Sequence, residues 1–544
     1  MQNQSNNIFD FIVVGSGPSG SILAAKLSEN ANHSVLLLEA GGEQNNEVAR
    51  SQAGFLALWE TEANWKFNTV PQKHLNNRVI WAPMGKALGG SSNINVGFWS
   101  RGAAGDYDGW NKLGLPDWSF KTALDAFLHI ENTERSSKNS TVRGGQGAVY
   151  MEDCERNTDI SDKLLDAFVE VGLGHIGDTN GDNPYVAGRS ETIHKNRYRR
   201  TIADAFLTAA VRRRPNLTIE THAFASKVLF ENNTAKGVEY TVSGQKKTAN
   251  AKKEVILCAG SINTPKLLML SGLGPKQHLE ELGIEVIKDI PGIGNNLQDH
   301  LGVNINVIAP AHVPVPQYGS FDGAAIHEWR FNKTGPATLL SGNNIGFFKL
   351  NPDADKPEFE IVPSYQPGFM NYETGQPFFQ NLKQGENRAG YSINVIILHP
   401  ESKGQVTLKS KDINESPNID PNYFGDPNDL ENLSKAVREI QKMTQTNALS
   451  HLTEEVSPAL TLTDTELKAF IKANVTTVFH PVGTAKMGLK EDPLAVVDNH
   501  LKVFGINGLR IADGSVFPTL ISGHTMAAAV YAGYQAAKFI NNQY

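Results

Sequence analysis

A glycine-rich turn close to the N-terminus limits most strongly what this chain can fold into. The apolar run at 8–14 (IFDFIVV) predicts a buried strand, and GSGPSG at 15–20 follows it directly. The residues at 21–30 (SILAAKLSEN) favour a helix, and those at 35–42 (VLLLEAGG) favour a second buried strand that ends in Glu39. A strand, a glycine turn, a helix and a strand within about 35 residues form one βαβ unit. The sequence therefore predicts an α/β domain of the Rossmann type.

The spacing inside this turn matches a dinucleotide-binding fingerprint. Gly15 permits the tight turn, Gly17 lets the backbone approach a pyrophosphate, and Gly20 lets the helix pack closely on the sheet. The N-terminus of the helix offers free N–H groups to the phosphates. Glu39, 19 residues after the last glycine, would accept hydrogen bonds from the adenosine ribose and repel a 2′-phosphate, which argues against NADP. A glycine-rich turn of an unrelated α/β protein is the alternative interpretation.

Composition and charge exclude several other classes of protein. With 544 residues, 40% of them hydrophobic and 20% charged, the chain is typical of a globular protein of two or more domains. Its net charge of −7 and the lack of long Lys or Arg runs argue against nucleic acid and anionic lipid as partners. No secretory signal and no stretch of roughly 20 apolar residues is present, so we expect no membrane span and a cytoplasmic location. Two cysteines, Cys154 and Cys258, are too few for a disulfide framework or a thiolate metal cluster.

Two histidines stand apart by their context. His480 lies in VFHPVGTAKMG (478–488), and His524 comes just before a helix expected at about 525–541. They are 44 residues apart and in neither an HxxxH nor an HExxH spacing, so we expect no metal site. The chain also lacks the GxSxG elbow of a serine hydrolase. PGIGNN (291–296) lacks the third glycine of a second nucleotide site, so one dinucleotide is expected to exchange electrons with a small molecule.

The middle of the chain, about 305 to 465, has the alternating pattern of antiparallel strands. YSINVIILHP (391–400) and GQVTLKS (404–410) are examples. Before them, 364–381 is rich in Gly, Pro and aromatic residues and predicts a surface loop or lid, whose aromatic side chains either pack in a cap or contact the substrate. Other elements are expected at 203–213 (helix), 217–230, 236–241 and 253–258 (strands), and from Thr264 and Pro265 onward (helix).

Two longer segments carry a family resemblance. GKALGGSSNIN (85–95) and GSINTPKLLMLSGLG (260–274) resemble the signature segments of the glucose-methanol-choline (GMC) family of FAD-dependent oxidoreductases. The resemblance extends through PGIGNNLQDH (291–300) and 478–488, covers the chain from about 8 to 541, and is weakest from 305 to 390. It implies an α/β chain, α+β overall, with a Rossmann-like FAD-binding domain and a second substrate domain built on an antiparallel sheet covered by helices. The implied division is 1–155, 200–304 and 470–544 for the FAD-binding domain, and 156–199 and 305–469 for the substrate-binding or cap domain.

The resemblance also implies roles for single residues. In this family the residue matching His480 is the catalytic base over the reactive face of the flavin, and the residue matching His524 lies beside it. Val228 would meet the adenine through its backbone. Ile94 stands where some relatives attach FAD covalently through a histidine, so non-covalent FAD is expected. The full set expected to bind FAD is Gly15, Gly17, Pro18, Ser19, Gly20, Glu39, Ser91, Asn95, Val96, Phe98, Val228, Asp513, Gly514 and Met526.

The expected reaction is the oxidation of a primary alcohol to an aldehyde by hydride transfer to flavin N5, with reoxidation by O2, giving H2O2, or by another acceptor. FHPVGTA and GLRIADGS are similar to segments of aryl-alcohol oxidases. Phe479 beside the base, Phe98, and Phe369 in the aromatic loop predict an apolar pocket that suits an aryl or furanic alcohol. Two alternatives stay open: a choline-type or sugar-type alcohol dehydrogenase of the same family, and a cyanohydrin lyase with a structural FAD.

Overall fold

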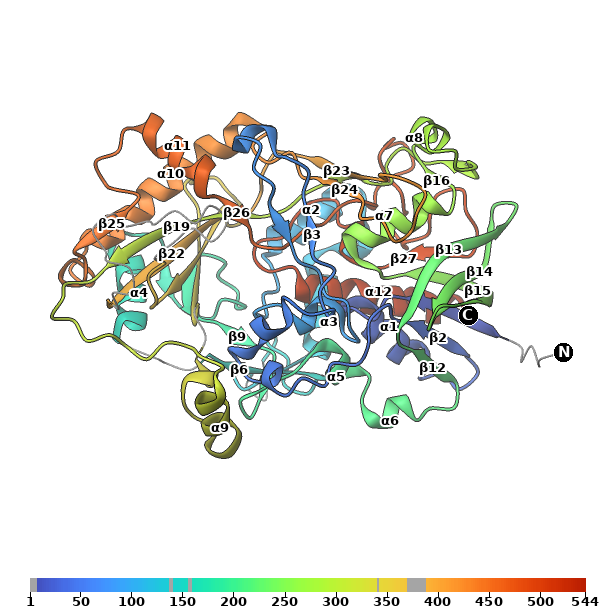
Figure 1. Cartoon of the computed structure of the whole chain (residues 1–544), viewed down its shortest axis with the longest axis horizontal. Coiled ribbons are helices and arrows are strands. Elements are labelled where there is room, and N and C mark those ends of the chain that lie inside the picture. Colours follow the sequence, from blue (N-terminus) through green and yellow to red (C-terminus); the bar gives the residue numbers. More distant parts are fainter. Residues whose placement is uncertain (1–6, 137–139, 155–158, 340–341, 369–387) are drawn as a thin grey trace.

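The chain is built on two large sheets, which lie toward opposite ends of its long axis (Figure 1). The structure is a computed structural model that describes residues 7–136, 140–154, 159–339, 342–368 and 388–544. Most of the aromatic loop expected at 364–381, with Phe369, lies outside the described residues. Among the described residues, no helix has both the length and the apolar character needed to cross a bilayer.

The first sheet has seven strands in the order β12-β2-β1-β15-β14-β13, with β27 paired to β15. Strands β12, β2, β1, the end of β15 and β27 are parallel, whereas β13 and β14 join as antiparallel strands. Their bounds are β1 Ile8–Val14, β2 Val35–Leu38, β12 Leu217–Glu220, β13 Ala223–Glu231, β14 Thr234–Val242, β15 Gln245–Leu257 and β27 Leu509–Ile511. This parallel core confirms the βαβ unit expected at the N-terminus.

Two helices from opposite ends of the chain cross each other beside this sheet. Helix α1 (Pro18–Leu27) packs against α12 (Met526–Gln543), and the Ser19 hydroxyl donates a 2.6 Å hydrogen bond to the carbonyl of Ala529. A Cβ atom on Gly533 would lie 2.3 Å from the carbonyl oxygen of Ser19, so the two backbones approach this closely only because position 533 is glycine. The expected C-terminal helix is confirmed.

The second sheet has eight strands in the order β25-β19-β22-β21-β20-β8-β7, with β26 paired to β19. It is antiparallel apart from the β7–β8 pair. The bounds are β7 His175–Ile176, β8 Val186–Arg189, β19 Leu301–Ile308, β20 Asn344–Phe348, β21 Phe359–Ser364, β22 Gly390–Ile397, β25 Glu455–Ser457 and β26 Thr476–Thr477. Strand β26 belongs to this sheet although it lies beyond residue 469, the expected end of the substrate-binding domain. The domain boundaries themselves stay a prediction.

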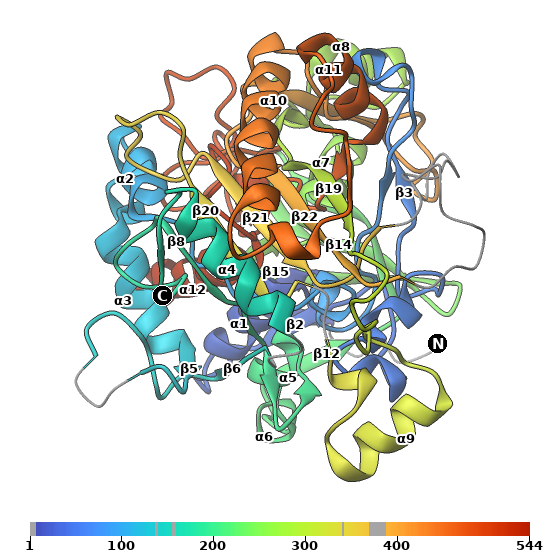
Figure 2. The same cartoon turned by 90° about the vertical axis from the view of Figure 1, so that its left-hand side faces the viewer.

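Alternation along the strands separates the two faces of this second sheet. Val303, Ile305 and Ile393 point into a core with helices α4 (Asp159–Glu170), α10 (Pro427–Gln441) and α11 (Asp464–Asn474). Figure 2 shows α4 and α10 lying across β20, β21 and β22. The opposite face carries Asn394 and Ile396, which line the cavity described below. The antiparallel sheet under helices is therefore confirmed, as is the α/β class with α+β character overall.

Two expected helices differ in detail. The stretch expected as one helix at 203–213 is two helices, because Thr208 interrupts it and accepts a hydrogen bond from Val211 as the N-cap of the second. Helix α7 (Gly260–Leu270) begins four residues before Thr264, and Pro265 lies inside it. Proline cannot donate to the carbonyl of Ser261, and the Thr484 hydroxyl donates to that oxygen instead at 2.6 Å.

The remaining elements connect the sheets. The helices are α2 Ala104–Lys112, α3 Phe120–Ile130, α5 Ile202–Phe206, α6 Ala209–Arg212, α8 Lys276–Glu281 and α9 Gly323–Asn332. The strands are β3 Phe67–Asn68, β4 Trp81–Ala82, β5 Glu131–Thr133, β6 Val149–Asp153, β9 Glu191–Thr192, β10 His194–Lys195, β11 Tyr198–Arg199, β16 Leu273–Gly274, β17 Lys288–Asp289, β18 Asn295–Leu297, β23 Gly404–Thr407 and β24 Asn418–Asp420. The strand expected at 404–410 is β23, which pairs with β18 and β24 in a small separate sheet.

Candidate active site

A cavity of about 510 Å³ lies where distant segments of the chain meet. Its wall includes the carboxyl end of β2, the 83–98 loop, the start of β13, the beginning of α7 and the segments around His480 and His524. The following residues expected to bind FAD line it: Gly15, Gly17, Pro18, Ser19, Glu39, Ser91, Asn95, Val96, Phe98, Asp513, Gly514 and Met526. Phe479 lines it as well, so one continuous space touches both the dinucleotide fingerprint and the two histidines.

Three helix N-termini open onto this cavity without a side-chain cap. They are those of α1, α7 and α12, whose N-cap residues are Gly17, Ala259 and Thr525. Uncapped N–H groups and the partial positive charge of a helix N-terminus bind phosphate and other anionic groups. Gly90 lies against Gly17, where an added Cβ would come within 2.6 Å of the Gly17 Cα atom. The 83–98 loop therefore packs against the fingerprint turn backbone to backbone, with no room for a side chain between Gly90 and Gly17. A dinucleotide site needs such close backbone packing.

Two buried carboxylates hold the backbone around the dinucleotide part of the cavity. Glu39 accepts hydrogen bonds from the N–H of Ser16 at 3.0 Å, from its hydroxyl at 2.6 Å, and from the N–H of Gly41 at 2.8 Å. A carboxylate has about four acceptor positions, so one remains for a ligand. Asp513 accepts from the N–H of Gly260 at 2.8 Å. Burial raises the pKa of both carboxyls, and these hydrogen bonds oppose the rise.

Two residues expected at the FAD site lie off the cavity. Gly20 is needed for packing inside the fingerprint turn, because a Cβ at this position would lie 1.9 Å from the carbonyl oxygen of Gly15. Val228 lies farther along β13 than the strand's cavity-lining residues, 223–225, and its N–H donates to the Ser271 hydroxyl at 2.9 Å. The structure thus places Val228 off the cavity lining, and its expected contact with the adenine stays a prediction.

The two histidines singled out by the sequence face each other. His480 Nε2 lies 3.1 Å from His524 Nδ1, and the rings are nearly perpendicular at 86°. On its other side, His480 Nδ1 lies 2.9 Å from Nδ1 of His300, and His300 Nε2 lies 2.9 Å from the carbonyl oxygen of Leu398. The sequence analysis did not identify His300, although it ends the PGIGNNLQDH segment.

This row of contacts fixes the proton positions. The Leu398 carbonyl can only accept, so His300 Nε2 carries a proton. Burial lowers the pKa of His300 to about 3, so the ring is neutral and its Nδ1 accepts from His480 Nδ1–H. Burial, followed by electrostatic repulsion from the neighbouring His524 and His300 rings, also holds the pKa of His480 well below its usual value. Neutral His480 therefore presents an unprotonated Nε2 at the cavity, which is the form of a general base.

A carboxylate lies behind the second histidine. Oε1 of Glu360 is 3.1 Å from Nε2 of His524, and the Glu360 side chain is fully buried. Its two oxygens make no hydrogen bond to the described residues, the nearby His524 included. Glu360 is on β21 at the register position of Ile396, so the second sheet brings this charge to the site. The sequence analysis did not identify it.

The backbone beside His480 is held in an unusual conformation. Phe479 has φ +67°, in the left-handed region that non-glycine residues rarely adopt. The N–H of Phe479 donates to the Thr477 hydroxyl at 2.7 Å, and the N–H of His480 donates to Oδ1 of Asp299 at 2.8 Å. Burial raises the pKa of Asp299 to about 6. Asp299 and His300 thus hold the base from two sides, one through its backbone and one through its ring.

Aromatic side chains surround the histidines. The ring of Phe98 lies edge-on to His524 with centroids 5.0 Å apart, and Phe479 contacts Trp59 and Trp81 in the same way at 6.0 and 5.8 Å. Asn394 adds a polar group to this otherwise apolar wall. Within the described residues no group of three or more His, Cys, Asp or Glu side chains could hold a metal ion.

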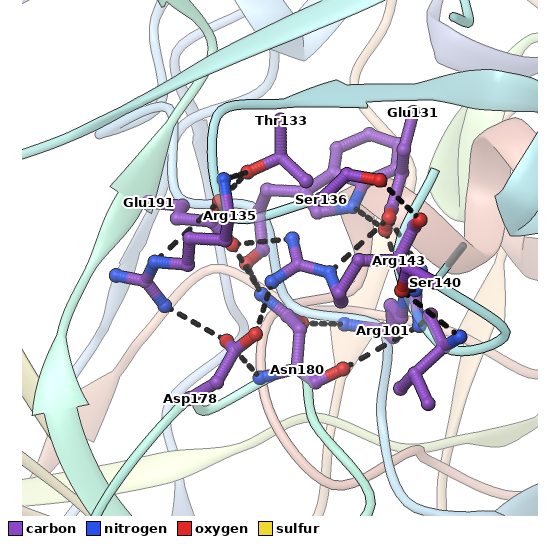
Figure 3. Close-up of polar contacts among 12 residues, drawn as sticks. Arg101, Glu131, Thr133, Arg135, Ser136, Ser140, Arg143, Asp178, Asn180 and Glu191 are labelled. Carbon is purple, nitrogen blue, oxygen red and sulfur yellow. Dashed lines mark hydrogen bonds and ion pairs between the residues drawn. The ribbon is translucent and has the colours of Figure 1, made fainter. Parts of the chain in front are cut away.

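A buried ionic cluster (Figure 3) anchors the segment that follows Phe98. Glu131 accepts a hydrogen bond from Trp99 Nε1 at 2.7 Å and forms an ion pair with Arg101. Trp99 and Arg101 follow Phe98 closely in the sequence. Arg143 pairs with Glu131 at 3.3 Å and with Glu191 at 2.5 Å. A buried charge that loses its partner costs free energy, so movement of this segment away from the cluster is unfavourable. The paired charges therefore hold this part of the cavity wall in one position.

Comparison with known proteins identifies relatives along the whole chain. Two sequence models described as GMC oxidoreductase match residues 9–302 and 400–533. The chain is 35% identical to an alcohol dehydrogenase (acceptor) of Pseudomonas putida, covering 98% of this chain and 96% of that protein. It is 34% identical to an oxygen-dependent choline dehydrogenase of Sinorhizobium fredii, covering 98% and 95%.

Solved structures share the fold. The structure superposes on pyridoxine 4-oxidase from Mesorbium loti with a TM-score of 0.88 and 27% identity, covering 98% of this chain and 100% of that one. A fungal aryl-alcohol oxidase has a TM-score of 0.83 with 22% identity, covering 98% and 99%, and at that identity the likeness concerns the fold alone.

Proposed function

The chain belongs to the GMC oxidoreductase family, and from this premise we propose that it is an FAD-dependent enzyme that oxidises a primary alcohol to an aldehyde. Membership rests on the two family matches and on relatives above 30% identity over nearly the full chain. The cavity fits FAD because it joins the fingerprint turn and three uncapped helix N-termini to the two histidines. When bound, FAD supplies the acceptor for the hydride that leaves the alcohol carbon.

The observation that carries the proposal is the unprotonated Nε2 of His480. This nitrogen accepts the hydroxyl proton of the substrate, and Nδ1 of His524, 3.1 Å away, hydrogen-bonds the same oxygen and holds it in place. His300 keeps the lone pair of His480 directed into the cavity. Phe98 and Phe479 restrict water around the two nitrogens. The residues of this chain thus bind and orient the alcohol and remove its proton.

We propose an aryl or furanic alcohol as the preferred substrate. Phe98, Phe479 and Trp59 form a largely apolar wall, whereas a sugar has many hydroxyls that would each cost about 1–3 kcal/mol if buried without a partner. A choline-type alcohol is the second candidate. Buried Glu360 favours it, because its two oxygens accept no hydrogen bond from the described residues and a carboxylate near aromatic rings suits an ammonium group. Of the two relatives named above, the alcohol dehydrogenase (acceptor) fits either substrate class, whereas the choline dehydrogenase fits the choline class.

Substitution His480→Ala tests the assignment of the base. The variant should retain the same flavin absorbance per chain and lose most of the rate of flavin reduction by alcohol, because removal of a general base typically costs 10² to 10⁴-fold. Reduction at the wild-type rate would overturn the role of His480. Comparing kcat/KM for a benzylic alcohol, glucose and choline, with peroxide formation and dye reduction measured together, tests the substrate class and the electron acceptor. A clear preference for glucose or choline contradicts the aryl assignment.

A further inference from the structure

Arg199 is a buried cation with no anion beside it. It belongs to β11, is 2% exposed, and has no carboxylate within ion-pair distance among the described residues. Asp204, which contributes to the electrostatics of Arg199, forms an ion pair with Arg50 at 2.5 Å. Burial of an unneutralised charge is expensive unless a counter-charge arrives from elsewhere. The position of Arg199 therefore needs an explanation beyond packing.

All polar contacts of Arg199 come from one nitrogen and go to the cavity loop. Nη2 donates to the carbonyl of Ser92 at 2.9 Å, and to the carbonyl and Oδ1 of Asn95 at 2.5 Å each. Nε and Nη1 have no hydrogen-bond partner among the described residues. The guanidinium carbon lies 5.5 Å from the ring centre of Phe55, another cavity residue, and a Cβ on Gly97 would come within 3.1 Å of Nη1. The charge thus lies directly behind the cavity wall.

These contacts orient the Asn95 amide. Guanidinium can only donate, so Oδ1 of Asn95 faces Arg199 and the amide NH2 group points the other way. There Nδ2 lies 3.2 Å from Sδ of Met526, and a thioether sulfur is a weak acceptor. Met526 is two residues from His524, so Asn95 offers its donor at the histidine end of the cavity.

We propose that Arg199 is a positioning residue that raises the electron affinity of the bound flavin, by holding Asn95 as a donor toward it and by placing an unneutralised positive charge behind that donor. The inference rests on FAD binding in this cavity, which is part of the proposed function. Transfer of hydride to a neutral flavin leaves one negative charge on the ring system. A nearby cation and an oriented N–H donor stabilise that charge before the reaction begins. The negative charge of the reduced cofactor would thus neutralise Arg199.

Sulfite provides a test that needs no alcohol substrate. It adds through sulfur to N5 of oxidised flavin, and its electron pair leaves the ring negatively charged, as reduction does. Arg199→Met should raise the Kd of sulfite about tenfold or more and lower the midpoint potential by about 30 mV, the equivalent of tenfold for a two-electron couple. Arg199→Lys keeps the charge and should stay near the wild type.

Two further variants separate charge from local shape. Arg199→Gln keeps an amide donor for Asn95 without the charge, so it should behave like Arg199→Met. Arg200→Met is the matched control, because Arg200 is exposed and, among the described residues, its side chain donates only to the carbonyl of Asp204 at 3.1 Å. If the Met variant does not retain FAD, the comparison of the Lys and Gln variants decides. Unchanged sulfite affinity and potential in both Lys and Gln variants would overturn the proposal, whether or not any alcohol is a substrate.

Discussion

Replacing His300 with phenylalanine removes the acceptor that fixes the proton of the catalytic base. In the native arrangement His480 Nδ1–H donates to His300 Nδ1 across 2.9 Å. Phenylalanine fills a similar space and leaves this buried N–H without a partner, which costs about 1–3 kcal/mol. His480 can escape that cost by moving its proton to Nε2, but then the nitrogen that faces the cavity no longer accepts a proton.

The size of the effect follows from this tautomer balance. At about 1.4 kcal/mol per tenfold, a penalty of 1–3 kcal/mol reduces the fraction of active tautomer by roughly 5- to 150-fold. Anaerobic stopped-flow measurement of flavin reduction reports this fraction, since it is independent of reoxidation. His300→Gln is the matched control: an amide can both accept from His480 and donate to Leu398, so it should retain much more activity. The reasoning is refuted if the phenylalanine variant holds a full complement of FAD and is reduced at the wild-type rate.

Three further outcomes are expected. Because Ile94 replaces a histidine to which FAD could be attached, acid precipitation should leave the flavin in the supernatant, and colour in the protein pellet would contradict this. The pKa of His480 is held well below 6.5, first by burial, so the base stays unprotonated and kcat/KM should remain constant as pH falls from about 8 to 6.5; a decrease that begins above pH 7 would contradict it. Substitution Arg143→Met strips a partner from buried Glu131 and Glu191 and should lower the free energy of unfolding by about 3–5 kcal/mol in urea titrations; an unchanged midpoint would show that the cluster adds nothing.

Local patterns in the sequence were sufficient for much of the first domain. The run of strand, glycine turn and helix from Ile8 to Leu27 needs only neighbouring residues, and the structure confirms it. The start of α7 was wrong because the side chain that makes Pro265 tolerable, Thr484, is more than two hundred residues away. Val228 was assigned to the adenine by resemblance to the family, and this contact stays a prediction, since the cavity is lined by residues 223–225 of the same strand.

The partners of the catalytic histidines could not be predicted in the same way. His300 lies 180 residues before His480, and Glu360 reaches His524 from the second sheet. Their roles depend on how two sheets with separate hydrophobic cores face each other, and a periodic pattern within either sheet carries no information about that arrangement. Arg199 was missed for a related reason, since its burial and the direction of its guanidinium emerge only when β11 is packed against the 92–95 loop.

The crossing of α1 and α12 sets the moment in biosynthesis at which this protein can receive its cofactor. Ser19 leaves the ribosome 510 residues before Ala529, yet its hydroxyl donates a hydrogen bond to the carbonyl of that residue, and β27 completes the sheet next to β15 only with residues 509–511. The wall around the fingerprint turn is therefore finished only after residue 529 has been translated. A nascent chain that stalls before Leu509 has the glycine turn but not the site, so flavin loading should follow the synthesis of residues 509–529, and products truncated before Leu509 should be colourless as well as inactive.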